Sequence, residues 1–287
     1  MSDGRIQLSE TERIAASPGW REHRVEVFDT SAGRVIAKGH RPQRSPTKHR
    51  ILNAAARLLG VPFLGAVPVH GGAESQAVEI RRLQALRAAG ARVPEVLHVA
   101  PDHFVMSWLG ANQLANLLHQ RHPAAFDLWL QGARSLVRVH AAGQYLSQCF
   151  GRNMIVDDSA DPPRFAGMID FEDDPLEVMS LPEAQVRDWL IYLQSTLWDL
   201  HVPESRIDST LRELMAAERP EVRALFATAC ERLGWLHRLP RKRKLGRDVV
   251  AVQAVAAAAH RWRWHRPDPG SSSFSSLSTE RQDEANP

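Results

Sequence analysis

The sequence predicts an α+β protein with two lobes, a small strand-rich N-terminal lobe and a larger helical lobe. Short stretches of alternating apolar and polar residues joined by turns are concentrated before position 110. After that position, apolar residues recur mostly at helical spacing. The chain has 287 residues, of which 44% are hydrophobic, so it is long and apolar enough to bury a core.

Alternation and turn residues define the N-terminal lobe, for which we expect residues 20–106. Gly33 lies in the turn of the first hairpin, and Gly90 ends a helix. Residues 1–19 are expected to be a loosely held lead-in. The elements expected in this lobe are a β-hairpin over 20–38, helices over 47–60 and 74–89, and a strand pair over 93–109.

Residues 107–265 are expected to form the helical lobe, with one β-hairpin inside it. Its strands, 154–156 and 165–169, enclose a stretch rich in turn residues. Ser, Pro and charged residues dominate 266–287, which we expect to be a disordered tail. The expected helices of this lobe are 111–121, 124–142, 183–200, 207–217, 220–237 and 248–264.

Composition and charge exclude several classes of protein. Lys and Arg number 36 against 33 Asp and Glu, and this mild excess gives no argument for nucleic-acid binding. Cys149 and Cys230 are too few for a disulfide framework and lack zinc-ligand spacing. The chain begins with polar and acidic residues and has no apolar run near the roughly 20 residues that span a bilayer. We therefore expect a cytoplasmic protein.

Four residues suggest phosphoryl-transfer chemistry: Lys38, Glu79, Asn153 and Asp170. Phosphoryl transfer needs cations placed around a spreading negative charge, and a strand lysine can supply one if a helix glutamate fixes it. Asn153 enters the second hairpin and Asp170 leaves it, so both fall at one end, where their oxygens can hold Mg²⁺. Each residue also has an ordinary interpretation: a surface lysine, a solvated glutamate, a turn asparagine or a turn-capping aspartate.

The ordered set of motifs resembles the protein-kinase-like superfamily. Within it, the chain is most similar to compact bacterial branches, the Kdo-type lipopolysaccharide-core kinases and small Bud-type kinases, and more distantly to aminoglycoside phosphotransferases. The resemblance covers about residues 20–200. It rests on VIAK (35–38), AVEIRRLQALRAAGARVPEVL (77–97), HFVMSWLG (103–110), VHAAGQYLSQCFGRNMIV (139–156), GMIDFEDDP (167–175) and RDW (187–189).

The resemblance implies a two-lobed kinase-like fold and ATP with Mg²⁺ as cofactors. Lys38 would bind phosphate, with Glu79 as its helix partner. Asn153 and Asp170 would be the metal ligands, and Asp170 would also be catalytic.

The resemblance also places the adenine site and the support of the catalytic loop. The segment 106–110, which includes Met106 and Trp108, would be the hinge that cradles adenine. Asp188 would be a buried helix carboxylate that props the catalytic loop.

The chain departs from the family pattern at three points. Gln148 stands at the position of the catalytic-base aspartate, although Glu172 or Asp173 nearby could replace that base. No G-x-G-x-x-G motif precedes Lys38, and the helix expected over 47–60 is additional. The leading interpretation is therefore an ATP- and Mg²⁺-dependent phosphotransferase, and the alternative is a nucleotide-binding pseudokinase that acts as a scaffold or regulator.

The acceptor is less defined than the nucleotide site. A glycan or lipid sugar hydroxyl is favoured over a protein. The run over 232–247 holds many Lys and Arg; it is either a solvated loop or a peripheral contact with anionic lipid. A basic adaptor that binds no nucleotide is a third possibility.

Overall fold

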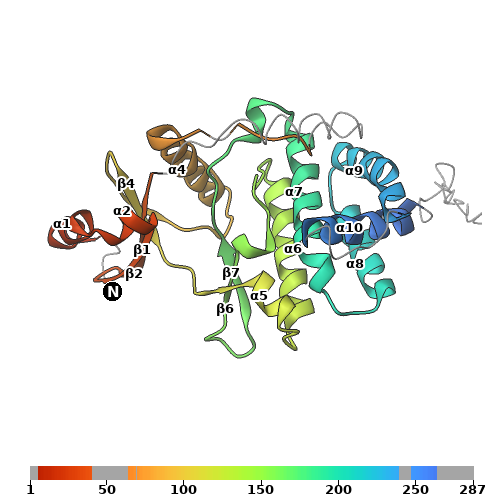
Figure 1. The fold of residues 1–287 in the computed structure, drawn as a ribbon, viewed down its shortest axis with the longest axis horizontal. Coiled ribbons are helices and arrows are strands. Elements are labelled where there is room, and N and C mark those ends of the chain that lie inside the picture. Colours follow the sequence, from red (N-terminus) through yellow and green to blue (C-terminus); the bar gives the residue numbers. More distant parts are fainter. Residues whose placement is uncertain (1–5, 41–63, 69, 239–246, 264–287) are drawn as a thin grey trace, which may run out of the picture.

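The computed structural model describes residues 6–40, 64–68, 70–238 and 247–263, and it is an α+β protein with two small antiparallel sheets (Figure 1). The helix expected over 47–60 and the tail expected over 266–287 lie outside the described residues. So does the part of the basic run between 239 and 246.

The first sheet has four antiparallel strands in the order β1-β2-β4-β3. The turn between β1 and β2 contains Gly33, whose φ of +94° is accessible to glycine at little strain. Both strand pairs expected in this part of the chain are confirmed. The strands are β1 (Val25–Thr30), β2 (Gly33–Gly39), β3 (Val96–Val99) and β4 (His103–Ser107).

Two helices precede this sheet, and they differ from the sequence expectation. Helix α1 (Leu8–Ala16) occupies much of the segment expected to be loosely held, and its Ile14 is fully buried. Helix α2 (Gly19–His23) occupies the start of the expected hairpin, so the prediction that the first strand begins at Trp20 is wrong. The indole N–H of Trp20 donates a hydrogen bond of 2.7 Å to the Ile14 carbonyl, which joins the two helices.

The two faces of β2 contact different parts of the protein because successive strand side chains point to opposite faces. Val35 and Ala37 pack in a small cluster with Ile14 and Trp20. Ile36, on the other face, belongs to the main core together with residues of α4 (Gly72–Ala88). By the same alternation, Lys38 shares the face of Ile36 and points toward α4.

The second sheet is built around the hairpin expected inside the helical part. Strand β6 (Met154–Asp157) pairs with β7 (Arg164–Met168) on one side and with β5 (Asn112–Gln113) on the other. The backbone N–H of Ile169 donates to the Asn153 carbonyl at 2.9 Å, which brings the two ends of the hairpin together. The chain before β6 and the chain after β7 therefore lie side by side.

Helices make up most of the remaining described structure, and Figure 1 shows the later ones gathered at the end opposite α1 and α2. Amphipathic faces pack into one core that includes Trp129, Trp189 and Tyr192. Among the described residues, no helix has both the length and the apolar character needed to cross a membrane. The helices are α5 (Leu114–His119), α6 (Ala125–Ala141), α7 (Leu181–Thr196), α8 (Glu204–Ala216), α9 (Pro220–Leu233) and α10 (Arg247–Arg263), with short 3-10 turns η2 (Gly151–Asn153), η3 (Pro175–Glu177), η4 (Leu197–Asp199) and η5 (Gly234–Arg238).

Candidate active site

Lys38 of β2 and Glu79 of α4 form a buried ion pair between the four-stranded sheet and the helix. Lys38 Nζ lies 2.7 Å from Glu79 Oε1. Both side chains are almost entirely removed from solvent, so each charge depends on the other for compensation. Glu79 lies on the face of α4 that also buries Leu83 and Leu86, which turns its carboxylate toward the sheet. The structure thus brings together the two residues expected to pair.

Asp170 brings a second carboxylate to the same lysine. Its Oδ1 lies 3.3 Å from Lys38 Nζ, and its side chain keeps 28% exposure. The φ of Asp170 is +73°, in the left-handed region that non-glycine residues seldom adopt. Strained backbone of this kind persists only where the surrounding structure holds it, and it is concentrated at functional sites. Asp170 is the most accessible carboxylate on Lys38.

Glu172 is the third carboxylate on Lys38, and it also contacts Arg24. Its Oε1 lies 2.8 Å from Lys38 Nζ, and the Arg24 guanidinium forms an ion pair with the same carboxylate. Arg24 ends α2 with a φ of +69°, which directs the chain into β1. Glu172 therefore connects the start of the first sheet to the segment that follows β7.

Glu79, Asp170 and Glu172 each place one oxygen within 4.8 Å of the others, and such a group could hold a metal ion. The Lys38 ammonium is hydrogen-bonded or ion-paired to all three carboxylates. A cation already lies among these oxygens, so a metal shared by all three would require Lys38 to withdraw. Three carboxylates against Lys38 and Arg24 leave one net negative charge, which still favours a cation at the accessible edge.

Asn153 lies beside this cluster at the entrance to β6. Its side-chain nitrogen donates a hydrogen bond of 3.0 Å to the Gln148 carbonyl. That bond assigns the amide nitrogen to the loop, so the amide oxygen is the atom left for a metal. Asn153 and Asp170, the two expected metal ligands, are placed by adjoining ends of one hairpin.

The loop between α6 and β6 carries Gln148, the residue at the expected base position. Gln148 Nε2 donates a hydrogen bond of 2.9 Å to Asp173 Oδ1, and Ser147 Oγ donates one of 2.8 Å to the same oxygen. Ser147 has a φ of +68°, which makes it the third left-handed residue near the site after Asp170 and Arg24. The amide at the base position is therefore in contact with a carboxylate.

Burial raises the pKa of Asp173 above its ordinary range, although the hydrogen bonds from Ser147 and Gln148 act in the opposite direction. A carboxylate with a raised pKa is a stronger proton acceptor once ionised. Asp173 is thus a carboxylate beside the expected base position, whereas Gln148 is an amide and cannot accept a proton.

A buried network supports this loop from below. Asp188 Oδ2 accepts a hydrogen bond of 2.6 Å from the backbone N–H of Leu146, which places Asp188 under the loop as expected. The same oxygen lies 3.4 Å from Nε2 of His140, whose Nδ1 lies 2.7 Å from Glu218. Burial lowers the pKa of His140, but the hydrogen bonds to Asp188 and Glu218 outweigh it and raise the pKa overall. A charged imidazolium suits both carboxylates because both ring nitrogens then donate.

Side-chain contacts also attach α4 to the loop. Arg82 donates a hydrogen bond of 2.6 Å to the Tyr145 carbonyl, and its guanidinium stacks 3.6 Å from the centre of the Tyr145 ring. Arg81 pairs with Asp174 at 3.0 Å, and the Tyr145 hydroxyl donates to that aspartate at 2.5 Å. These contacts fix the helix that carries Glu79 relative to the loop that carries Gln148.

Met106 lies near the end of β4, which pairs with the lysine strand β2, and Trp108 directly follows β4. Met106 is buried in the core and lies opposite Ile36 in the sheet. Trp108 is partly buried, and its backbone N–H donates to the Arg34 carbonyl at 3.1 Å. That backbone donor is therefore occupied by β2, and adenine recognition by this segment stays a prediction.

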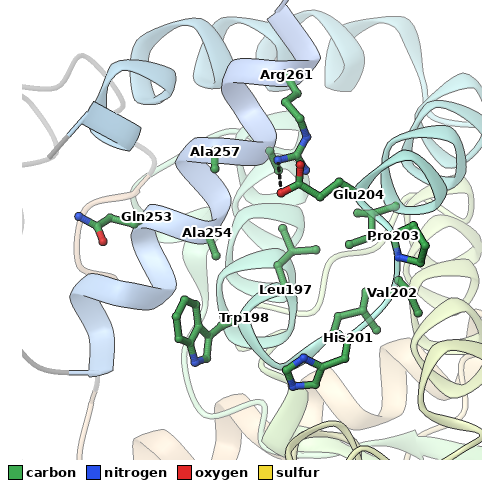
Figure 2. A pocket seen from close by; sticks show the side chains of 13 residues that line it. Leu197, Trp198, His201, Val202, Pro203, Glu204, Gln253, Ala254, Ala257 and Arg261 are labelled. Atoms are coloured by element: carbon green, nitrogen blue, oxygen red, sulfur yellow. Dashed lines mark ion pairs between the residues drawn. The ribbon is translucent and has the colours of Figure 1, made fainter. Parts of the chain in front are cut away.

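A cavity of about 510 Å³ lies elsewhere, between η4 and α10 (Figure 2). Trp198 and His201 lie on one side of it, and the ion pair of Arg261 with Glu204 lies on another. Its lining includes none of the residues around Lys38. The cavity is thus separate from the candidate active site.

Comparison of the chain with protein-family models finds no matching family, and comparison with curated proteins finds no match. The chemistry of the site is therefore argued from its own residues.

Sequence reasoning identified Lys38, Glu79, Asn153 and Asp170 as members of this cluster but missed Arg24. For Glu172 and Asp173, the sequence left several roles open: joining Asp170, replacing the catalytic base, or simply belonging to a loop. Their signal was position, because they directly follow the buried Phe171 in an otherwise apolar stretch. Arg24 carried no signal, since a single arginine within a predicted hairpin is ordinary on a protein surface.

Proposed function

We propose that the protein is an ATP- and Mg²⁺-dependent phosphotransferase with a two-lobed, kinase-like arrangement. One observation carries this proposal: a buried lysine from a strand pairs with a helix glutamate and also meets an aspartate 132 residues away. Burying the lysine ammonium costs desolvation free energy. A fixed cation beside an accessible carboxylate is what binding a phosphate group and its metal ion requires, so a phosphate site explains why the protein maintains this arrangement.

In this proposal, Lys38 binds the phosphate groups of the nucleotide. The Glu79 carboxylate holds the long lysine side chain in one position, which reduces the conformational entropy lost when phosphate binds. A positioned ammonium stabilises charge on the transferring phosphoryl group without reorganisation.

Asn153 and Asp170 are the residues that would hold Mg²⁺. Both supply hard oxygen donors, which is the ligand type that Mg²⁺ takes from proteins. When bound, the ion neutralises charge on the phosphate oxygens. The hydrogen bond from Asn153 to Gln148 orients the amide oxygen, and the net negative charge of the cluster attracts the cation.

Asp173 is the residue that orients the hydroxyl group of the phosphate acceptor or takes its proton. Gln148 holds the Asp173 carboxylate by a hydrogen bond and cannot itself take a proton. In a loose phosphoryl-transfer transition state the acceptor hydroxyl is little deprotonated, so correct orientation supplies much of the benefit.

The remaining parts of the proposal follow the resemblance of the sequence. The segment 106–110, with Met106 and Trp108, would bind adenine where the two lobes meet. The acceptor would be a glycan or lipid sugar hydroxyl, or a protein. A cytoplasmic protein in peripheral contact with anionic lipid through 232–247 would suit a lipid acceptor.

A second candidate function is a nucleotide-binding pseudokinase that acts as a scaffold or regulator. The amide at Gln148 favours it, as does the lack of a glycine-rich phosphate motif before Lys38. In that case ATP would bind and no acceptor would be phosphorylated.

The direct test is ATP consumption by purified protein against a panel of sugars, lipid-linked glycans and protein acceptors. We expect transfer to one acceptor class and its loss in Asp170→Asn, which keeps the size of the side chain but removes its charge. ATP binding without transfer to any acceptor would support the pseudokinase instead. If the protein neither binds ATP nor transfers phosphate, both candidate functions are overturned.

A further inference from the structure

Lys38 is bound by more carboxylates than a phosphate-binding lysine needs. Glu79 at 2.7 Å is enough to position the ammonium, and Asp170 lies farther away at 3.3 Å. Glu172 adds a third contact at 2.8 Å, nearly as close as that of Glu79. Lys38 thus donates hydrogen bonds to Glu79 and Asp170, and Glu172 adds a third negative charge against the same ammonium.

Glu172 differs from the other two carboxylates because it has a cation of its own. Its side chain is 1% exposed, and Arg24 forms an ion pair with it from the end of α2. If Lys38 turned away from Glu172, the carboxylate would keep Arg24 and would not be left as an unpaired buried charge. Among the residues that the structure describes, Glu79 forms its ion pair with Lys38.

We propose that Glu172 competes with the phosphate groups of the nucleotide for Lys38 and so weakens nucleotide binding in the resting protein. This inference rests on the proposed function. In the resting arrangement, the Glu172 carboxylate is ion-paired with the ammonium that the phosphate would otherwise meet. When nucleotide binds, Lys38 exchanges its ion pair with Glu172 for a contact with phosphate, and Arg24 retains Glu172.

The arrangement also predicts opposite effects for the two partners of Glu172. Without Glu172, the lysine loses a competitor, so phosphate binds more tightly. Without Arg24, Glu172 loses one cation and holds Lys38 more firmly, so phosphate binds more weakly. A purely structural role for the Arg24–Glu172 pair would make both substitutions act in the same direction.

The test compares Glu172→Gln, Arg24→Gln and the wild type in two measurements. The first is the Kd for ATP with Mg²⁺ by titration calorimetry. The second is the rate at which acetyl N-hydroxysuccinimide modifies Lys38, followed by mass spectrometry, which reports on the lysine without nucleotide. Glu177→Gln is the matched control, because it removes one carboxylate from the same segment at a residue that contacts His70.

We expect Glu172→Gln to bind ATP about tenfold more tightly, about 1.4 kcal/mol, and to be acetylated faster at Lys38. We expect Arg24→Gln to change both quantities in the opposite direction, and Glu177→Gln to match the wild type.

Equal or weaker ATP binding by a folded Glu172→Gln overturns the inference while the proposed function stands. If no variant binds ATP but Lys38 acetylation responds as expected, the ion pairs are real and both the proposed function and the competition are overturned. If Glu172→Gln does not fold, unchanged or tighter ATP binding by Arg24→Gln overturns the inference.

Discussion

The amide nitrogen of Gln148 donates a hydrogen bond of 2.9 Å to the Asp173 carboxylate, and Ser147 donates to the same oxygen. The Gln148 amide and the Asp173 carboxylate are thus joined by a hydrogen bond at the expected base position, where the sequence has an amide instead of a proton acceptor. This contact changes how Gln148 should be tested, because removing its side chain alters the electrostatics of Asp173.

Asp173→Asn should lower kcat by about 10²–10⁴-fold, the usual contribution of a general base. Asparagine keeps the size of the side chain and can still accept hydrogen bonds from Gln148 and Ser147, so the fold should survive. Rates of phosphate transfer to the identified acceptor, with Tm as the check on folding, provide the measurement. A wild-type rate in the asparagine variant would show that Asp173 takes no part in proton transfer.

The pH dependence of the reaction should carry the same signature. Burial raises the pKa of Asp173, and a base is active only when ionised, so kcat/KM should increase with pH through a value above the ordinary aspartate range. Gln148→Ala removes a hydrogen bond that stabilises the ionised form of Asp173. The rise of kcat/KM with pH should then move to higher pH. The Gln148 account is wrong if the alanine variant leaves the profile unchanged.

His140 should make stability depend on pH. Its pKa is raised in the folded protein, so the stability it contributes is complete below its unfolded pKa, near 6.5. That contribution should be lost as pH rises through the folded pKa. His140→Gln should therefore destabilise the protein by about 3 kcal/mol at pH 6 and by less at pH 9, as measured by denaturant unfolding. A constant His140→Gln deficit across this pH range would contradict a charged imidazolium.

Gly167 should be intolerant of a side chain. A Cβ at this position would lie 2.5 Å from the Arg92 carbonyl oxygen, which accepts a hydrogen bond from the neighbouring Met168 N–H. Gly167→Ala should therefore lower the free energy of unfolding by about 2–3 kcal/mol. Gly143→Ala is the control, because Gly143 also has positive φ but no atom lies within 4 Å of its added Cβ. Equal losses in the two variants would show that the close approach to Arg92 does not matter.

The elements of this protein could largely be predicted from local sequence, because periodicity and turn residues act over short distances. The strand pairs, the hairpin that places Asn153 and Asp170, and the helix that carries Glu79 are examples. Alternation around Lys38 also indicates which side of β2 faces the helix. These features depend on residues that are neighbours in the chain.

The contacts that give the site its character could not be predicted in this way. Glu172 and Arg24 are separated by about half of the chain, and their pairing depends on how α2 and the segment after β7 pack. The same holds for Asp173, whose raised pKa comes from burial by distant residues. At Trp20, the local pattern itself predicted the wrong element. Trp20 continues an alternating pattern typical of a strand, but its packing with Ile14 holds it in a helix.

Calorimetric titration of ATP into the full-length protein, with Mg²⁺ and then with excess chelator, tests the central claim most directly. The wild type should bind ATP with Mg²⁺, and chelation should weaken that binding. Lys38→Ala and Asp170→Ala should each raise Kd about tenfold or more, since charge-assisted contacts with phosphate or metal contribute about 1.5–3 kcal/mol each, while His119→Ala should bind as the wild type does. Equal affinity of the wild type, Lys38→Ala and Asp170→Ala for ATP, or no binding by the wild type, would contradict the assignment of this cluster as a nucleotide site.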